Sequence, residues 1–227
     1  ATAALLLIPG FLLPLLRIGD AIDVLAYGVA VLGVNLIVGH AGQVALGHAA
    51  FVGVGAYTSV ILSADHGWPL LATIPAGAAV AFALGLLIGI PALRINGLYL
   101  ALITLAFGAA FGPIVKRMDT ITGGTSGKGT SSVLVAPTWF GESRIANARW
   151  NCAIAAIVVA VVVALTRNIV SGRVGRSLVA MRENELGALC FGVDVRRWKL
   201  VMFGLSAAVA SIGGSLLKNR SSFSLSI

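Results

Sequence analysis

Charge is the scarcest property of this 227-residue sequence, because only 11% of its residues are Asp, Glu, Lys or Arg. A soluble domain carries about 25% charged residues, and a disordered chain combines high charge with few apolar residues. This sequence is instead 58% hydrophobic, with a mean hydropathy of +0.99. The shortage of charge therefore excludes a water-soluble domain and a disordered chain, and it predicts an integral membrane protein.

Cysteines and catalytic motifs are also scarce. The two cysteines, Cys152 and Cys190, fall near opposite membrane faces in the topology predicted below, which argues against a disulfide, and they have no metal-ligand spacing. The sequence has no His-Glu-x-x-His, no Gly-x-Ser-x-Gly and no paired carboxylates within its apolar windows. Without such carboxylates, coupling to protons or sodium ions is a weak hypothesis. We expect neither an enzyme nor an ion-driven pump.

Two glycine-rich segments come close to nucleotide-binding motifs but do not match them. A phosphate loop would need Gly at Thr122 and Ser or Thr at Gly129. Gly53 and Gly55 lack a third glycine, because Thr58 occupies its place. We therefore expect no nucleotide on this chain, and any ATP that drives it must be hydrolysed by another subunit.

What the sequence has in abundance is apolar windows long enough to span a membrane. They cover 1–16, 21–38, 44–62, 69–90, 98–115, 150–165 and 200–217, and an eighth would begin at Ser222. A bilayer core needs about 20 apolar residues per helix, so the windows predict an all-α fold: a polytopic transmembrane helix bundle of about 7–8 helices. We expect a single transmembrane domain over 1–227.

Glycine is plentiful, at 28 residues, and much of it lies within these windows. Gly85 with Gly89, and Gly108 with Gly112, have the four-residue spacing that allows helix backbones to approach closely in lipid. We interpret these pairs as general helix packing, which predicts a tight bundle and says little about its cargo.

The distribution of basic residues orients the bundle. The net charge is +8, and 7 of the 16 Lys and Arg residues lie in 167–199. A basic loop between apolar windows is typical of the cytoplasmic side. The sequence therefore predicts a cytoplasmic loop over about 167–199 and an external, glycine-rich loop over about 116–149. A basic membrane face without any partner is an alternative that charge alone leaves open.

Four polar residues stand out in the run 35–51, which includes the end of one apolar window, the start of the next and the short gap between them. They are Asn35, His40, Gln43 and His48. A polar residue at membrane depth must find a partner or line a wet cavity. Gly39, Gly42 and Gly47 would permit a broken helix, a feature that recurs at transporter binding sites. A translocation pathway and simple bonding across helices explain these residues about equally well.

A second informative segment lies inside the basic loop, where 177–191 is predicted to form a short amphipathic helix that Gly192 ends. One face of this helix carries Leu178, Met181, Leu186 and Leu189. Its remaining positions include Arg176, Arg182, Glu183 and Glu185. Such a helix either rests on lipid headgroups or docks into a groove on a partner. Anionic lipid would repel Glu183 and Glu185, so the sequence favours a partner.

Four blocks of the sequence resemble the LivM-type permeases of branched-chain amino acid ABC transporters. The blocks are NLIVGHAGQVALGHAAFVGVGAYTS, INGLYLALITLAFG, ITGGTSG and GRSLVAMRENELGALCFGVDVRRWKL, in the family's order. The resemblance implies a bacterial inner-membrane permease paired with a second, related permease. It also implies two cytoplasmic ATPase subunits, which bind ATP and Mg²⁺, and a periplasmic or extracellular substrate-binding protein. No cofactor is expected on this chain itself.

The resemblance also suggests residue roles. The family's cytoplasmic coupling loop has a Glu, a small residue and a Gly spaced like Glu185, Ala188 and Gly192 here. Together with the amphipathic pattern, the resemblance predicts coupling to the ATPase through Leu178, Met181, Arg182, Glu183, Glu185, Ala188 and Gly192. In this prediction Leu178 and Met181 supply the apolar contact, and the charged residues meet polar groups at the rim of the docking groove. Here Gly187 departs from the usual alanine-rich filling and lowers helix propensity. Because the family continues through further helices beyond 217, we expect this sequence to be an incomplete copy of a longer protein.

The leading prediction is therefore an ABC-importer permease that forms half of a translocation pathway for branched-chain amino acids. A urea or short-amide permease is an alternative within the family, because those subunits share the same blocks. A channel or membrane scaffold without ATP coupling is an alternative from a different class.

Overall fold

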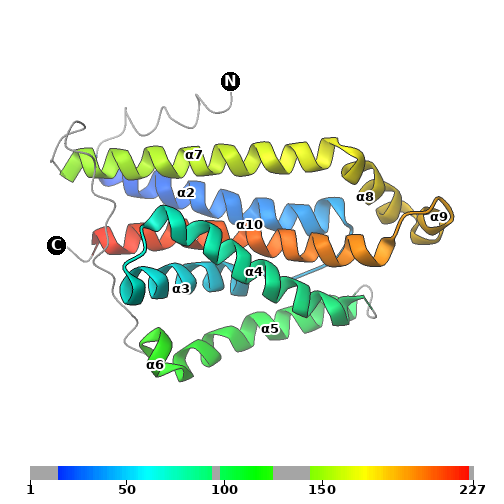
Figure 1. The fold of residues 1–227 in the computed structure, drawn as a ribbon, viewed down its shortest axis with the longest axis horizontal. Coiled ribbons are helices and arrows are strands. Elements are labelled where there is room, and N and C mark those ends of the chain that lie inside the picture. The colour runs from blue at the N-terminus through cyan, green and yellow to red at the C-terminus, as the bar shows by residue number, and fades with distance from the viewer. Residues whose placement is uncertain (1–14, 94–97, 125–143, 225–227) are drawn as a thin grey trace.

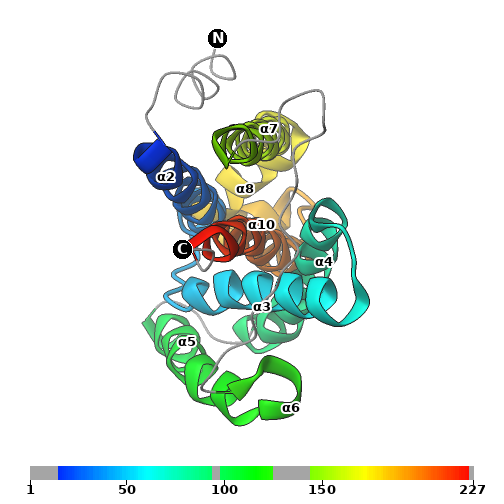
Figure 2. The ribbon, with the colours of Figure 1, turned by 90° about the vertical axis from the view of Figure 1, so that its left-hand side faces the viewer.

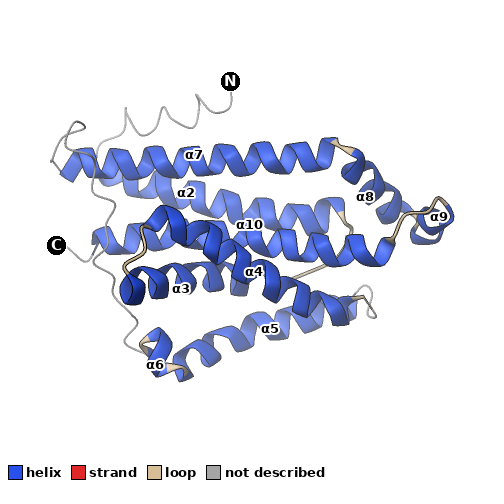
Figure 3. Ribbon diagram, in the orientation of Figure 1, coloured by secondary structure: helices blue, strands red, loops and turns tan. Residues whose placement is uncertain are grey.

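The computed structural model describes residues 15–93, 98–124 and 144–224 (Figure 1). Within these ranges every regular element is a helix, which confirms the predicted all-α class (Figure 3). Five helical stretches are long and apolar enough to cross a membrane: Gly19–His40, Leu71–Pro91, Tyr99–Arg117, Ala146–Ser171 and Val195–Leu217. The prediction of a polytopic transmembrane bundle is therefore confirmed. The predicted window 1–16 and residues 125–143 of the predicted external loop lie outside the described residues.

The helices follow the predicted windows, with shifted ends. In chain order they are α2 (Leu15–Val34), the π-helical turn η1 (Asn35–His40), α3 (His48–His66), α4 (Leu70–Ala92), α5 (Leu98–Arg117), α6 (Asp119–Thr122), α7 (Arg144–Ser171), α8 (Arg173–Glu183), α9 (Glu185–Cys190) and α10 (Val195–Ser224). The basic loop predicted over 167–199 is thus mostly helical. Residues 222–224 continue α10, so no separate helix begins at Ser222 within the described residues.

α10 lies at the centre of the bundle, with α2, α3 and α4 packed around it (Figure 2). α7 lies outside α2, and α5 lies outside α3. Of the α10 span, 61% is buried inside the chain, against 22–33% of the other four candidate spans. The outer spans therefore present most of their apolar surface to lipid or to another subunit.

Small residues allow this close packing around α10. A Cβ placed on Gly33 of α2 would lie 2.7 Å from the carbonyl oxygen of Ser206 in α10. Gly214 of α10 likewise lies directly against the backbone of Val52 in α3. Helices in lipid gain nothing from the hydrophobic effect by associating, so van der Waals contact at such close approaches holds the bundle together.

The two predicted glycine pairs differ in outcome. Gly85 is confirmed as a close contact, because a Cβ there would lie 2.8 Å from the Cβ of Ala207 in α10. Gly108 approaches the backbone of Gly47. A Cβ on Gly112, in contrast, would have no described atom within 4 Å, so packing at this glycine stays a prediction.

The connections lie at two opposite ends of the bundle (Figure 1). α6, the start of α7 and the turn between α3 and α4 lie at one end, while α8 and α9 lie at the other. The described ends of the predicted external loop, at α6 and the start of α7, therefore lie opposite the predicted cytoplasmic loop. Which end faces the cytoplasm stays a prediction from the basic residues.

Candidate functional site

The helix break expected from the glycines is present between η1 and α3. α2 passes into a π-helical turn at Asn35, and residues 41–47 are not helical. Gly42 has a φ of +67°, a conformation that a residue with a Cβ rarely adopts. π-helical turns are rare and often occur at functional sites. The break makes 35–48 the first candidate region within the bundle.

Two of the four polar residues in this segment face the central helix. Gln43 is buried, and its Nε2 donates to the carbonyl oxygen of Lys199 at 3.5 Å. His48 is also buried, and its Nε2 lies 3.1 Å from Oγ of Ser206. Both partners belong to α10, so Gln43 ties the break, and His48 the first residue of α3, to the centre of the bundle.

The other two polar residues point elsewhere. Asn35 is exposed on the surface of the chain. His40 is half-buried, and its Nδ1 lies 3.2 Å from the carbonyl oxygen of Asn35. The structure therefore does not bring the four residues to one point. For Gln43 and His48 the contacts favour bonding across helices, and a pathway role for the four residues stays a prediction.

The amphipathic helix predicted over 177–191 is two helices rather than one. α8 ends at Glu183 and α9 begins at Glu185, with Asn184 between them in an extended conformation (φ −152°, ψ 105°). Oδ1 of Asn184 accepts a hydrogen bond from the Gly187 N–H at 2.9 Å and so caps α9. The single helix was wrongly predicted because Asn favours a cap over a helix interior.

This break separates the predicted apolar face into two parts. Leu178 and Met181 of α8 are buried, at 0% and 1% exposure, whereas Leu186 and Leu189 of α9 are exposed. The buried pair belongs to a cluster with Leu36, Ala41, Ala188, Val195 and Met202. α8 therefore packs its apolar side on the chain's own η1, α9 and α10. The prediction that all four residues share one face is wrong, because the extended Asn184 turns α9 away.

Gly192 ends α9 in the left-handed conformation that a C-terminal stop uses, with a φ of +78°. The N–H of Val193 donates to the carbonyl oxygen of Ala188 at 3.0 Å, and the N–H of Gly192 donates to that of Leu189, also at 3.0 Å. These bonds close the end of the helix, as the sequence predicted.

Charged residues of the same segment are held by specific contacts. Nη1 of Arg182 donates to the carbonyl oxygen of Gly39 at 2.6 Å. Nζ of Lys199 pairs with Oε1 of Glu185 at 2.5 Å, and the Lys199 side chain is buried while Glu185 is exposed. Sequence reasoning placed Lys199 only in the basic cluster. Its ion-pair partner Glu185 lies on a different helix, so the local pattern gave no signal for this pair.

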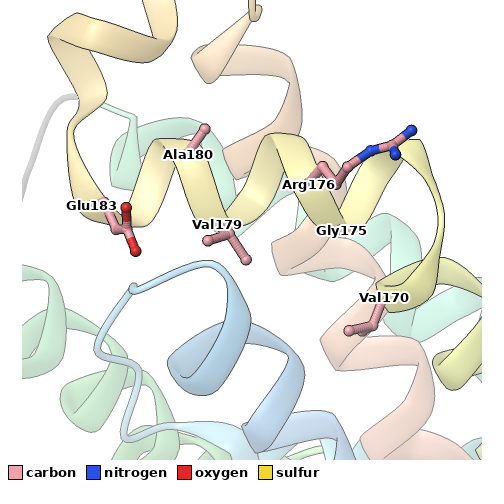
Figure 4. A pocket seen from close by; sticks show the side chains of 6 residues that line it. All are labelled: Val170, Gly175, Arg176, Val179, Ala180 and Glu183. Atoms are coloured by element: carbon pink, nitrogen blue, oxygen red, sulfur yellow. The ribbon is translucent and has the colours of Figure 1, made fainter.

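An open groove of about 390 Å³ runs along α8 (Figure 4). Its lining consists of Val170, Gly175, Arg176, Val179, Ala180 and Glu183. Val179 and Glu183 lie on the same side of α8, while Arg176 extends from the start of the helix. The groove is open and mostly apolar, which suits a surface contact better than an enclosed small-molecule site.

Comparison with known protein families finds one that matches most of this chain. Residues 19–225 match the family described as "Branched-chain amino acid transport system / permease component". The chain belongs to this permease family. The match includes all four blocks on which the predicted resemblance rested, so that prediction is confirmed.

Two relatives of this permease are named "High-affinity branched-chain amino acid transport system permease protein LivM". The protein of Escherichia coli (strain K12) is 31% identical over 214 residues, and that of Salmonella typhimurium (strain LT2) is 30% identical over 214 residues. Each alignment covers 85% of this chain and 50% of the relative, so the chain spans about half the length of these curated relatives. No solved structure matches the chain.

Family membership and the five candidate spans together make this permease a multi-pass membrane transport component. Among the described residues, no group of three or more His, Cys, Asp or Glu could hold a metal ion. The sequence reasoning also missed Phe191, which at 89% is the most exposed of the large apolar residues whose side chains the structure describes. The signal for Phe191 in the sequence was its position next to Gly192, the residue that ends α9.

Proposed function

We propose that this permease forms half of an ATP-driven pathway that imports branched-chain amino acids across the bacterial inner membrane. The family match over 19–225 carries the proposal, and the names of both relatives support it. A second, related permease would supply the other half of the pathway. A periplasmic or extracellular binding protein would deliver the cargo and provide most of the discrimination between cargoes.

The outer face of α2 and η1 suits a half-pathway. Val24, Tyr27, Val31 and Val38 are exposed along this face, and Asn35 lies among them. Their spacing places all five residues on one stripe of a helix. A polar side chain that faces out of a span must find a partner or water. The second permease or the cargo would complete the hydrogen bonds of Asn35.

The exposed apolar residues of α9 suit docking to an ATPase subunit. Leu186 and Leu189 of α9 are exposed at one end of the bundle, as is Phe191 directly after the helix (Figure 1). An exposed apolar cluster of this kind marks an interaction surface, and a helix in a groove is a common way to cover it. Leu178 and Met181 would then support α9 from within the chain instead of contacting the partner.

In this proposal ATP and Mg²⁺ bind to the partner subunits and not to the permease. ATP binding draws the two ATPase subunits together, and α8 and α9 of each permease follow the groove in which they dock. That movement switches the permease pair between outward and inward access. ATP acts here by binding one conformation of the complex more tightly than the other.

Uptake of labelled leucine by the assembled complex in proteoliposomes tests the proposal. Leucine should accumulate only when both ATP and the binding protein are present, and unlabelled urea in excess should not compete. Uptake without ATP would instead identify a channel. Competition by urea, together with urea accumulation, would assign the cargo to short amides.

A further inference from the structure

α8 is attached directly to the helix break. Arg182, in the last turn of α8, donates from Nη1 to the carbonyl oxygen of Gly39, 143 residues away in the sequence. The same side chain packs over Gly42, because a Cβ placed there would lie 2.9 Å from Cγ of Arg182. One side chain therefore contacts both the last residues of η1 and the turn that follows.

The accepting carbonyl is one that the break leaves without its helical partner. In a continuous α-helix, the carbonyl oxygen of Gly39 would accept the N–H of Gln43. Here the N–H of Gln43 donates to Ile37 instead, at 3.1 Å. The bond from Arg182 to Gly39 is on the exposed side of the break, where a carbonyl that has lost its helical donor is satisfied by a side chain or by water. Arg182 supplies a charged donor, which forms a stronger hydrogen bond than a neutral one.

Further contacts join the same two regions. Nε2 of Gln43 donates to the carbonyl oxygen of Lys199 at the start of α10, and Nζ of Lys199 pairs with Glu185 of α9. Leu178 of α8 packs in the same buried cluster as Leu36 of η1. The turn after η1 is thus fixed to α8, α9 and α10 by polar bonds and by apolar packing.

We propose that Arg182 is a positioning residue that locks the helix break to α8 and α9, so that both move as one body. When an ATPase subunit displaces α9, the turn over 39–43 is carried with it. The break would then be the part of the bundle that first changes position during the transport cycle. This inference rests on the proposed function, because it assumes that an ATPase displaces α9.

The ratio of leucine imported to ATP hydrolysed, measured for the assembled complex in proteoliposomes, tests this role. Arg182→Ala should lower the ratio at least about tenfold, as expected when a hydrogen bond to a charged group is lost, while subunit stoichiometry and ATP hydrolysis stay near wild type. Arg182→Lys keeps a charged donor and should restore most of the ratio. Arg173→Ala is the matched control, because it removes an exposed arginine from the first turn of the same helix, and it should keep the wild-type ratio.

A distance measurement tests the rigid attachment independently of transport. Spin labels at Val44 and Val179, both exposed, are placed in a Cys190→Ser background, since Cys190 is the exposed cysteine. The distance between the labels should not change when ATP is added to the complex that keeps Arg182. Arg182→Ala should broaden the distribution of distances between the labels.

Two results would overturn the role of Arg182: a wild-type ratio of import to hydrolysis in assembled Arg182→Ala complexes, or an ATP-dependent change of the label distance in the wild type. A loss of assembly with a normal ratio in the assembled fraction also overturns it, since that is a purely structural effect. Absence of ATP-dependent uptake by the wild type would instead refute the proposed function.

Discussion

Replacing Met181 and Leu186 by alanine, one at a time, should separate the folding of α8 and α9 from their proposed docking to an ATPase subunit. Met181 is 1% exposed and packs between η1, α9 and α10, so Met181→Ala leaves a cavity in the chain's own core. Truncating a buried Met or Leu to Ala costs about 2–5 kcal/mol. That is a large part of a typical free energy of unfolding of about 5–15 kcal/mol. We expect a clear fall in the thermal stability of the purified permease.

Leu186→Ala should weaken binding of the ATPase subunit and leave the stability of the permease almost unchanged. Leu186 is 75% exposed, and substitutions at such positions usually change stability by no more than about 0.5 kcal/mol. If α9 docks into the ATPase, truncating a central contact should cost more than about 1 kcal/mol of binding, which weakens the affinity roughly fivefold. Phe191→Ala, at the most exposed apolar side chain of the segment, should behave in the same way.

The assay compares thermal unfolding of the isolated permease with titration of the ATPase subunit onto it. The reasoning requires Met181→Ala to lower the unfolding temperature, and Leu186→Ala to lower only the ATPase affinity. If Leu186→Ala and Phe191→Ala both bind the ATPase at wild-type affinity, α9 is not the contact. A basic segment that rests on the inner leaflet would then be the better interpretation.

Three further predictions follow from single positions. Gly33→Ala should destabilise the permease by about 1–3 kcal/mol in thermal unfolding, because its Cβ would meet the α10 backbone, whereas Gly28→Ala on the same helix has open space and should not. Gly192→Val should lose about 1–3 kcal/mol through its positive φ and reduce ATPase binding, while Gly192→Asn should be nearly neutral; equal effects of the two variants would contradict the strain argument. A cysteine at Ile121 should react with an impermeant reagent from outside and one at Val179 should not; the reverse pattern would invert the orientation.

The spans themselves could be predicted from composition, because a bilayer requires a helix wherever about 20 apolar residues follow one another. Six predicted windows coincide with α2 and η1, α3, α4, α5, α7 and α10, and all of these except α3 belong to the five candidate spans. Their ends differ from the predicted ones. α10 begins at Val195 and not at 200, since Arg196, Arg197 and Lys199 lower the local hydropathy without ending the helix.

The broken helix could be predicted too, because backbone freedom is a local property. Gly42 adopts a positive φ, and the chain leaves the helix between 41 and 47 as the glycines indicated. The stop at Gly192 was predicted for the same reason. What the residues at the break contact was not predictable, because the partners of Gln43 and His48 lie 156 and 158 residues further along the chain.

Tertiary structure alone decided which apolar faces are inside. In water, the period of apolar residues tells the buried side of a helix from the exposed side. In a membrane both sides are apolar, so the pattern does not show that α10 is central or that α5 and α7 are peripheral. Likewise, the local sequence does not show which of Leu178 and Leu186 is buried. Because Asn184 ends α8 and caps α9, Leu178 faces the chain's own core while Leu186 is exposed.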